Sequence, residues 1–178
     1  MNLWYLLLQH PDQWAAVQAD AALWTPAFDE MLRHSTSIGG QPRHNTFDLE
    51  MHGVHVPAGS LMHMVDVSAN HDDRVFADPE RFDIFRDDLH TGKILRSGYK
   101  GEGKCSHMAF GIGPHLCPGA WISQQEGVIG SQALAPVLRN VEIAVDRMAK
   151  DIDGTSLAPI GLGSVRELWL EFDLPEGR

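Results

Sequence analysis

The stretch Phe110-Gly111-Ile112-Gly113-Pro114-His115-Leu116-Cys117-Pro118-Gly119 governs how the rest of the chain is interpreted. Glycines and prolines surround a single cysteine here, so we expect a tight loop instead of a helix or strand. Residues 120–126 follow without a helix breaker and predict a helix. Cys117 should therefore lie at a helix entrance, with Pro118 in the first turn. The helix dipole and unpaired backbone N–H groups there favour a thiolate, the form of cysteine that binds soft metals.

An isolated free cysteine before a helix is more often a buried structural residue, but that interpretation leaves the glycines and the His-x-Cys spacing unexplained. At Phe110, Gly113, His115, Cys117 and Gly119 the sequence resembles the haem-binding loop of cytochromes P450. The resemblance implies that the cofactor is haem b, that Cys117 is the axial ligand of its iron, and that His115 reaches a haem propionate. It also implies that Phe110 packs near the proximal haem face.

The same resemblance gives the loop glycines a role. Gly111, Gly113 and Gly119 are expected to let the backbone approach the porphyrin and the cysteine sulfur closely. Arg43 falls where the family often has an arginine that donates to a haem propionate; the alternative for Arg43 is an ordinary surface arginine. The other cysteine, Cys105, lies in a Gly/Lys-rich segment and is expected to be a free exposed thiol, because the loop motif is missing around it.

A second motif, Glu30-x-x-Arg33, places two opposite charges on one helical face. On most helices such a pair is solvated and contributes only about 0.2–0.5 kcal/mol. Here it resembles the buried Glu-x-x-Arg pair of the P450 K helix. The segment Pro79-Glu80-Arg81-Phe82 resembles the one from which the family takes a third partner. We therefore expect Glu30, Arg33 and Arg81 to form a structural ion network that takes no part in the chemistry.

The resemblance implies an α+β fold and one domain over residues 1–178. This domain corresponds to the C-terminal part of the mainly helical P450 fold, with K-type and L-type helices, a small antiparallel sheet, a meander and the Cys haem loop. Apolar residues at helical spacing in residues 1–23 and 128–145, and alternation from Phe47 to Met51, agree with that order. The expected segments are helices over 1–37, a small sheet over 38–69, a meander and loop over 70–104, the haem loop over 105–119, a helix over 120–150 and terminal strands over 155–174.

Composition excludes several classes of protein. The 178 residues carry a net charge of −10, which argues against a nucleic-acid partner or an anionic membrane surface. The apolar run at residues 4–8 is too short to cross a membrane, and two cysteines fit a reducing cytoplasm. The ten histidines show no metal-ligand spacing, so we expect scattered surface or hydrogen-bonded side chains.

The resemblance covers only the C-terminal part of a family whose chains are much longer. The central helix that carries the family's proton-delivering acid–alcohol pair has no counterpart before Met1, and no distal catalytic residue is identified. The first hypothesis is therefore a truncated or split P450-type oxidoreductase of the monooxygenase family, not competent alone. Its partners would be haem, a redox protein (ferredoxin or flavoprotein), and a missing N-terminal half or a second copy. The alternatives are a small haem-binding or sensing module, and a non-catalytic P450-like interaction protein.

Overall fold

A computed structural model of the chain describes residues 1–94, 100–148 and 167–174. Its α-helices are α1 (Asn2–Gln9), α2 (Pro11–Ala19), α3 (Trp24–His34), α4 (Asp66–Asn70) and α5 (Ala120–Leu134), and its 3₁₀ turns are η1 (Ala21–Leu23), η2 (Gly113–His115) and η3 (Val145–Arg147). Its strands are β1 (Gln41–His44), β2 (Leu49–Met51), β3 (Val54–Val56), β4 (Leu61–Met64), β5 (Lys100–Gly101), β6 (Lys104–Cys105), β7 (Arg139–Ile143) and β8 (Leu170–Asp173). Among these residues the strands form two-stranded antiparallel pairs: β1–β4, β2–β3, β5–β6 and β7–β8. No helix among the described residues is long and apolar enough to cross a membrane.

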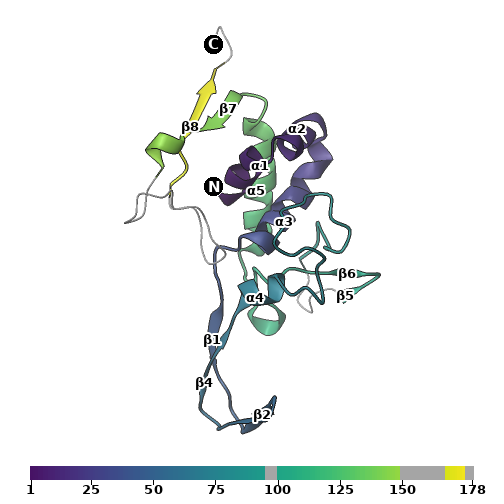
Figure 1. Cartoon of the computed structure of the whole chain (residues 1–178), viewed down its shortest axis with the longest axis vertical. Helices are drawn as coiled ribbons and strands as arrows, with labels where there is room; N and C mark the ends of the chain where they lie inside the picture. The colour runs from purple at the N-terminus through teal and green to yellow at the C-terminus, as the bar shows by residue number, and fades with distance from the viewer. Residues whose placement is uncertain (95–99, 149–166, 175–178) are drawn as a thin grey trace.

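The core lies among the first helices and α5, which gather in one half of the molecule (Figure 1). Residues 2–7 of α1 are all buried, because α1 contacts α2, α3 and β7. Pro11 occupies the first turn of α2, where its missing N–H leaves no helical hydrogen bond unmade. Trp4, Trp14 and Trp24 bring their rings within 5.0–6.4 Å of one another, so three helices share one aromatic cluster.

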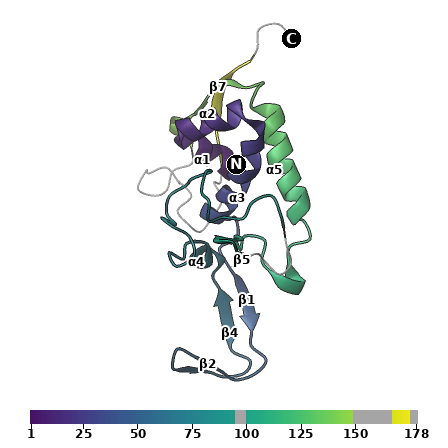
Figure 2. The same ribbon diagram turned by 90° about the vertical axis from the view of Figure 1, so that its right-hand side faces the viewer.

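Helix α5 runs along the side of this bundle and packs on α3 (Figure 2). A Cβ atom on Gly127 would overlap the ring of Phe28, so glycine is what lets the two helices approach this closely. Nearby, the Trp4 indole N–H donates to the Ser131 hydroxyl at 3.0 Å, in a buried position. Helix α5, which follows the Cys117 loop, is thereby fixed to α1 and to α3, the helix that carries Glu30 and Arg33.

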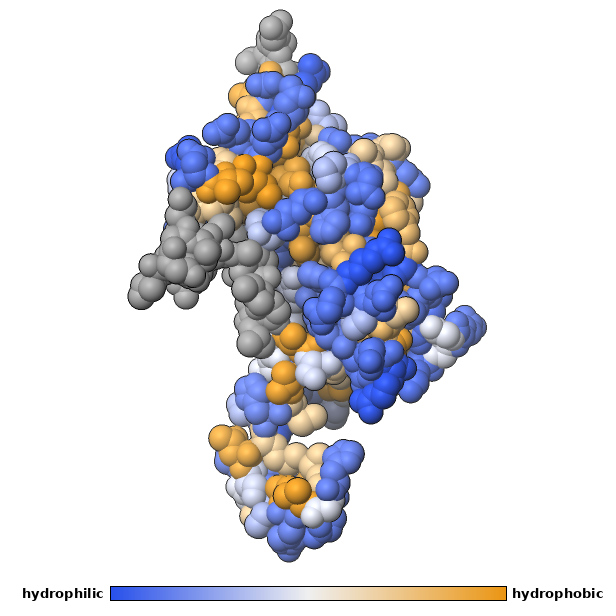
Figure 3. All heavy atoms as spheres, in the orientation of Figure 1, coloured by the Kyte–Doolittle hydropathy of each residue, from blue (hydrophilic) through white to orange (hydrophobic). Residues whose placement is uncertain are grey.

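The strands β1 and β4 form an arm that projects away from the helices and ends in the β2–β3 hairpin (Figure 1). Along the arm Gln41 pairs with Met64 and His44 with Leu61. Several apolar side chains on it are exposed, and apolar surface is visible on this part of the molecule in Figure 3. These side chains are Phe47, Met51, Val54, Leu61 and Met64.

The C-terminal part differs from the sequence-based expectation. Helix α5 ends at Leu134 and does not extend over 120–150, because Pro136 follows two residues later and cannot continue a helix. Of the apolar positions after it, Val141 belongs to β7 (Arg139–Ile143), which pairs with β8 (Leu170–Asp173), and Val145 begins the η3 turn. The predicted terminal strands therefore include β8, whose partner lies before residue 155. Residues 155–166 lie outside the described residues.

Candidate functional site

The Cys117 loop is closed by hydrogen bonds within its own backbone. The Cys117 N–H donates to the Phe110 carbonyl at 2.9 Å, and the Gly111 N–H donates to the Met108 carbonyl at 2.8 Å. Gly111 and Gly113 have φ angles of 70° and 77°, in the left-handed region that favours glycine. A Cβ atom on Gly113 would meet nothing within 4 Å, so the surface above it is open to an approaching ligand.

Cys117 lies just before α5 and its thiol is exposed. The helix begins at Ala120 with Gly119 as its N-cap, so Pro118 precedes the first turn instead of occupying it. The Ala120 N–H donates to the Cys117 carbonyl at 3.2 Å, which joins the loop to the helix. Gly119 has an ordinary φ of −85°, and a Cβ atom there would lie 3.8 Å from the Cys117 sulfur. Its smallness thus keeps the space beside the sulfur free.

The two predicted propionate partners are both exposed. His115 ends the η2 turn, two residues before Cys117. Arg43 lies on β1 and donates to the Pro42 carbonyl at 2.8 Å and to the Gln41 side-chain oxygen at 2.9 Å. A Cβ atom on Gly111 would lie 3.4 Å from the Gln41 amide nitrogen, so the beginning of β1 borders the Cys117 loop.

Arg33 is the most completely satisfied side chain of the region. Its relative exposure is 0%. Arginine carries five guanidinium N–H groups, and hydrogen bonds to protein oxygens use all five. Nε and Nη2 donate to the two Glu30 carboxylate oxygens at 2.7 and 3.0 Å. The remaining donors reach main-chain carbonyls of Asn70, Pro79 and Arg81 at 2.9, 2.8 and 3.1 Å. One buried cation thus fixes α3, α4 and the meander together.

The third charged member of this network is Arg86, which corrects the expectation for Arg81. Arg86 Nη1 lies 3.3 Å from Glu30 Oε1, and its side chain is only 7% exposed. The Arg81 side chain is 67% exposed and pairs with Asp83 at 3.3 Å, so Arg81 contributes its carbonyl alone to the network. The two arginines lie on separate turns of the meander, since the Arg81 N–H donates to the Asp78 carbonyl and the Arg86 N–H to the Asp83 carbonyl, and the path of the backbone decides which side chain points inward. No pattern in the sequence marks that choice.

Sequence reasoning also missed three buried polar residues that hold neighbouring segments in place. Gln13 donates to the Phe82 carbonyl at 3.0 Å and accepts from the Ile84 N–H at 2.9 Å, which joins α2 to the meander. Asp29 accepts from the Gly92 N–H at 2.7 Å and from Gln124 on α5 at 3.3 Å. Asn70 accepts from the Met108 N–H at 2.7 Å through its side-chain oxygen. A polar side chain at an otherwise apolar helical position, such as Gln13, is the signal that could have found them.

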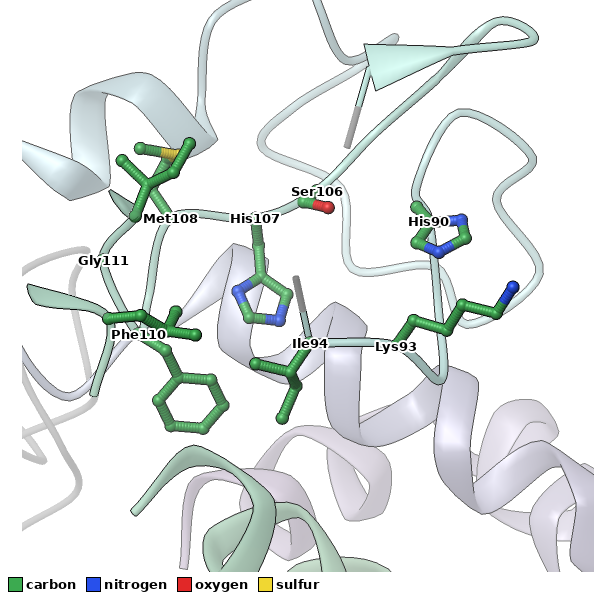
Figure 4. A pocket seen from close by; sticks show the side chains of 10 residues that line it. His90, Lys93, Ile94, Ser106, His107, Met108, Phe110 and Gly111 are labelled. Atoms are coloured by element: carbon green, nitrogen blue, oxygen red, sulfur yellow. The ribbon is translucent and has the colours of Figure 1, made fainter. Parts of the chain in front are cut away.

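A small pocket lies beside the Cys117 loop (Figure 4). In this view His90 and Lys93 are on one side of it, Met108 and Phe110 on the other, and His107 between them. The His107 and Phe110 rings are 5.9 Å apart. The cavity holds about 20 Å³, which is room for a water molecule and not for a planar cofactor. Burial lowers the pKa of His90, and the nearby charges of Lys93 and Lys104 lower it further.

The open side of the loop fits the haem that the sequence resemblance implies. The exposed Cys117 thiol would provide a soft axial ligand, and glycines at 111, 113 and 119 would leave room for a flat ring. The exposed His115 and Arg43 can donate to carboxylates at its rim. Among the described residues no group of His, Cys, Asp and Glu side chains could hold a bare metal ion.

Comparison with known proteins gives one consistent family. The sequence model of the family described as Cytochrome P450 matches residues 11–165. The chain is 31% identical over 160 residues to the steroid C26-monooxygenase of Mycobacterium tuberculosis, covering 86% of this chain and 39% of that protein. It is also 31% identical over 142 residues to the 6-deoxyerythronolide B hydroxylase of Saccharopolyspora erythraea, covering 80% of this chain and 31% of that protein.

Solved structures agree with this. The P450 heme domain of Tepidiphilus thermophilus has a TM-score of 0.76 and 31% identity, over 99% of this chain and 38% of that one. The cytochrome P450 CYP109Q5 of Chondromyces apiculatus has a TM-score of 0.76 and 28% identity, over 99% of this chain and 40% of that one. The chain thus spans well under half the length of the proteins it matches. Since the family model matches most of the sequence, this chain belongs to the cytochrome P450 family.

Proposed function

We propose that this chain is the haem-thiolate part of a P450-type oxidoreductase, with Cys117 as the axial ligand of the haem iron. P450 family proteins bind haem b. The observation that carries the proposal is the position of Cys117. An exposed thiol lies on a loop closed by its own backbone, and that loop leads into α5, which packs on α3, the helix that carries the buried Glu30–Arg33 pair. A rigid support under a soft ligand is what an axial cysteine requires.

When bound, haem supplies the chemistry of oxygen activation. The residues of this chain would hold and tune it. Cys117 would bind the haem iron through its sulfur, with Phe110 packed beside it, and the thiolate would donate electron density to the iron. His115 and Arg43 would hold the propionates. The Cys117 N–H is engaged by the Phe110 carbonyl, so the cysteine backbone is fixed while the sulfur stays exposed.

We further propose that the chain is not a competent monooxygenase by itself. The chain covers 39% of the steroid C26-monooxygenase and 31% of the 6-deoxyerythronolide B hydroxylase. With Cys117 exposed, the described residues place no wall over the loop that would exclude water or position a substrate. Substrate binding and proton delivery would come from polypeptide outside these 178 residues, and electrons from a ferredoxin or flavoprotein. Two free cysteines fit a cytoplasmic location.

A second candidate function is a small haem-binding or sensing module that covers its open face by self-association. The exposed apolar side chains of α5 favour it, because a surface of this kind invites contact with another protein. They are Trp121, Ile122, Ile129 and Leu134, each more than 50% exposed.

The decisive experiment is an absorption spectrum of the chain with haem added, reduced and exposed to carbon monoxide. We expect the red-shifted Soret band of a thiolate complex. We expect Cys117→Ala to lose it completely, because no other thiol lies in the loop. Cys105→Ala, which removes the other cysteine, is the matched control and should keep the band.

A thiolate-type band that persists in Cys117→Ala would refute the assignment. A haem complex with no thiolate character in the unaltered chain would refute it as well. Light scattering of the haem-loaded chain separates the two candidate functions: a stable dimer favours the self-associating module, and a monomer favours a part that awaits its other half.

A further inference from the structure

Asn70 is a buried polar residue whose side chain takes no part in binding Arg33. It ends the short helix α4 and its relative exposure is 0%. Its main-chain carbonyl accepts from Arg33 at 2.9 Å, and its side-chain Oδ1 accepts from the Met108 N–H at 2.7 Å. Because the Met108 N–H can only donate, it fixes the orientation of the amide, with Nδ2 toward the Leu32 carbonyl at 3.5 Å.

These contacts connect the buried ion pair to the cysteine in three steps. The Asn70 side chain accepts a hydrogen bond from the Met108 N–H. The Met108 carbonyl accepts from the Gly111 N–H at 2.8 Å, and the Phe110 carbonyl accepts from the Cys117 N–H at 2.9 Å. Phe110 and Gly111 are adjacent, so a displacement at Met108 moves the carbonyl that fixes Cys117. The path runs through the backbone of a loop whose own hydrogen bonds are all short-range.

A second contact restrains the same point of the chain from the other side. His107, next to Met108, has Nε2 3.6 Å from Asp29 Oδ1, and both side chains are 10% exposed or less. Asp29 precedes Glu30 on α3. The entrance of the loop, residues 107–108, is therefore held between α3 and α4.

We propose that Asn70 is a positioning residue for Cys117: its side-chain amide sets the entrance of the cysteine loop relative to the Glu30–Arg33 pair. The importance of this position for an iron ligand rests on the proposed function, whereas the restraint on the loop does not. The side chain can be removed separately from the network, since Arg33 binds the main-chain carbonyl of Asn70, which every substitution retains.

Hydrogen–deuterium exchange of the chain without haem tests this. In Asn70→Ala we expect peptides covering residues 107–119 to exchange about ten-fold faster, since one buried hydrogen bond that anchors them is lost. Asn70→Asp keeps an oxygen that can accept from Met108 and should restore most of the protection. The matched control is Gln13→Ala, which removes another buried amide, 4% exposed, that binds residues 82 and 84. This variant should accelerate amide exchange in the meander and leave the exchange rate of residues 107–119 unchanged.

The proposal is overturned if Asn70→Ala leaves the exchange of residues 107–119 at the level of the unaltered chain. It is also overturned if Gln13→Ala accelerates them equally, because Asn70 would then act through overall stability alone. A haem titration separates this result from the proposed function. If the unaltered chain gives no thiolate spectrum, the function fails while the exchange result stands. If it does give one, Asn70→Ala should lower the thiolate fraction several-fold, and an undiminished fraction counts against the proposal.

Discussion

The Glu30–Arg33 pair and the Cys117 loop lie close together in the fold, yet they are built in opposite ways. The pair is fully buried, and every arginine donor has a partner. The loop keeps its cysteine and histidine exposed and relies on glycines for its shape. Buried charges contribute stability only when they are fully paired, whereas a ligand must be left accessible. The buried pair therefore holds the fold, whereas the loop is built as the proposed cofactor site requires.

Because the two regions are built differently, we expect substitutions in them to change different measured quantities. Changes in the buried pair should appear mainly as a loss of folding free energy. Changes in the loop should appear mainly as altered cofactor binding, as with Cys117→Ala. Asn70 joins the two regions, which is why its effect should appear in the loop although it is itself buried.

The largest expected effect comes from breaking the buried pair. Glu30→Ala leaves Arg33 buried without its carboxylate and should lower the free energy of unfolding by about 3–5 kcal/mol. It also removes one of the two carboxylate partners of Arg86, which keeps Asp88, and the acceptor of the Asp83 N–H. Urea denaturation followed by circular dichroism measures the loss. Because domains are typically stable by only about 5–15 kcal/mol, the loss should remove a large share of the folding free energy.

Arg81→Ala is the matched control for that prediction. Its side chain is 67% exposed and its contribution to the network is a carbonyl, which alanine retains. The change in unfolding free energy should stay within about 0.5 kcal/mol. A loss in Arg81→Ala as large as that in Glu30→Ala would mean that Arg81, and not Arg86, completes the ion network.

A smaller effect is expected where α3 and α5 touch. Gly127→Ala places a methyl group into the ring of Phe28, and overpacking of this kind costs about 1–3 kcal/mol. Gly130→Ala, three residues further along the same helix, meets nothing within 4 Å and should stabilise the chain by about 0.5–1 kcal/mol. Thermal unfolding of the two variants should shift the midpoint in opposite directions. Equal shifts would show that the helices are not in close contact at Gly127.

Much of this architecture could be predicted because it depends on local signals. The Cys117 loop carries its own glycines and prolines, and the Glu30–Arg33 spacing is a helical one. The family, its fold and its haem cofactor followed from those two motifs and are confirmed by the comparisons. The assignments of His115 and Arg43 to propionates remain predictions.

The rest could not be predicted because it depends on long-range packing. Arg81 and Arg86 are the same residue type five positions apart in the meander, and only the tertiary path shows which one reaches Glu30. Asn70 contacts Met108 across 38 residues, and no periodicity reports such a bond. The apolar residues of β7 resembled a continued helix, and the pairing with β8 overrides that local pattern. Pro136 is the local signal that the helix ends.

The smallest expected effect is a pH dependence of stability that comes from His34, which lies next to the buried Glu30–Arg33 pair. His34 follows Arg33, and its ring contacts the Ser35 hydroxyl, the Glu80 carbonyl and the rings of His71 and Phe82. Burial lowers the pKa of His34 below its ordinary value of 6.5, and the charges of Arg33 and His71 lower it further, against the opposing effect of Glu30 and the Glu80 carbonyl. The folded chain therefore prefers the neutral imidazole.

The unfolded chain protonates His34 at its ordinary pKa, so below about pH 6.5 it binds more protons than the folded chain does. Stability should fall as the pH drops from about 6.5 towards the lowered pKa of the folded state, and then level off. His90, whose pKa burial also lowers, adds to the loss in the same direction. Urea midpoints at several pH values, compared between the unaltered chain and His34→Gln, measure the share of His34. The slope should be shallower in the variant. An unchanged slope would show that His34 titrates alike in both states, and that the buried pair does not extend its influence to its neighbour on α3.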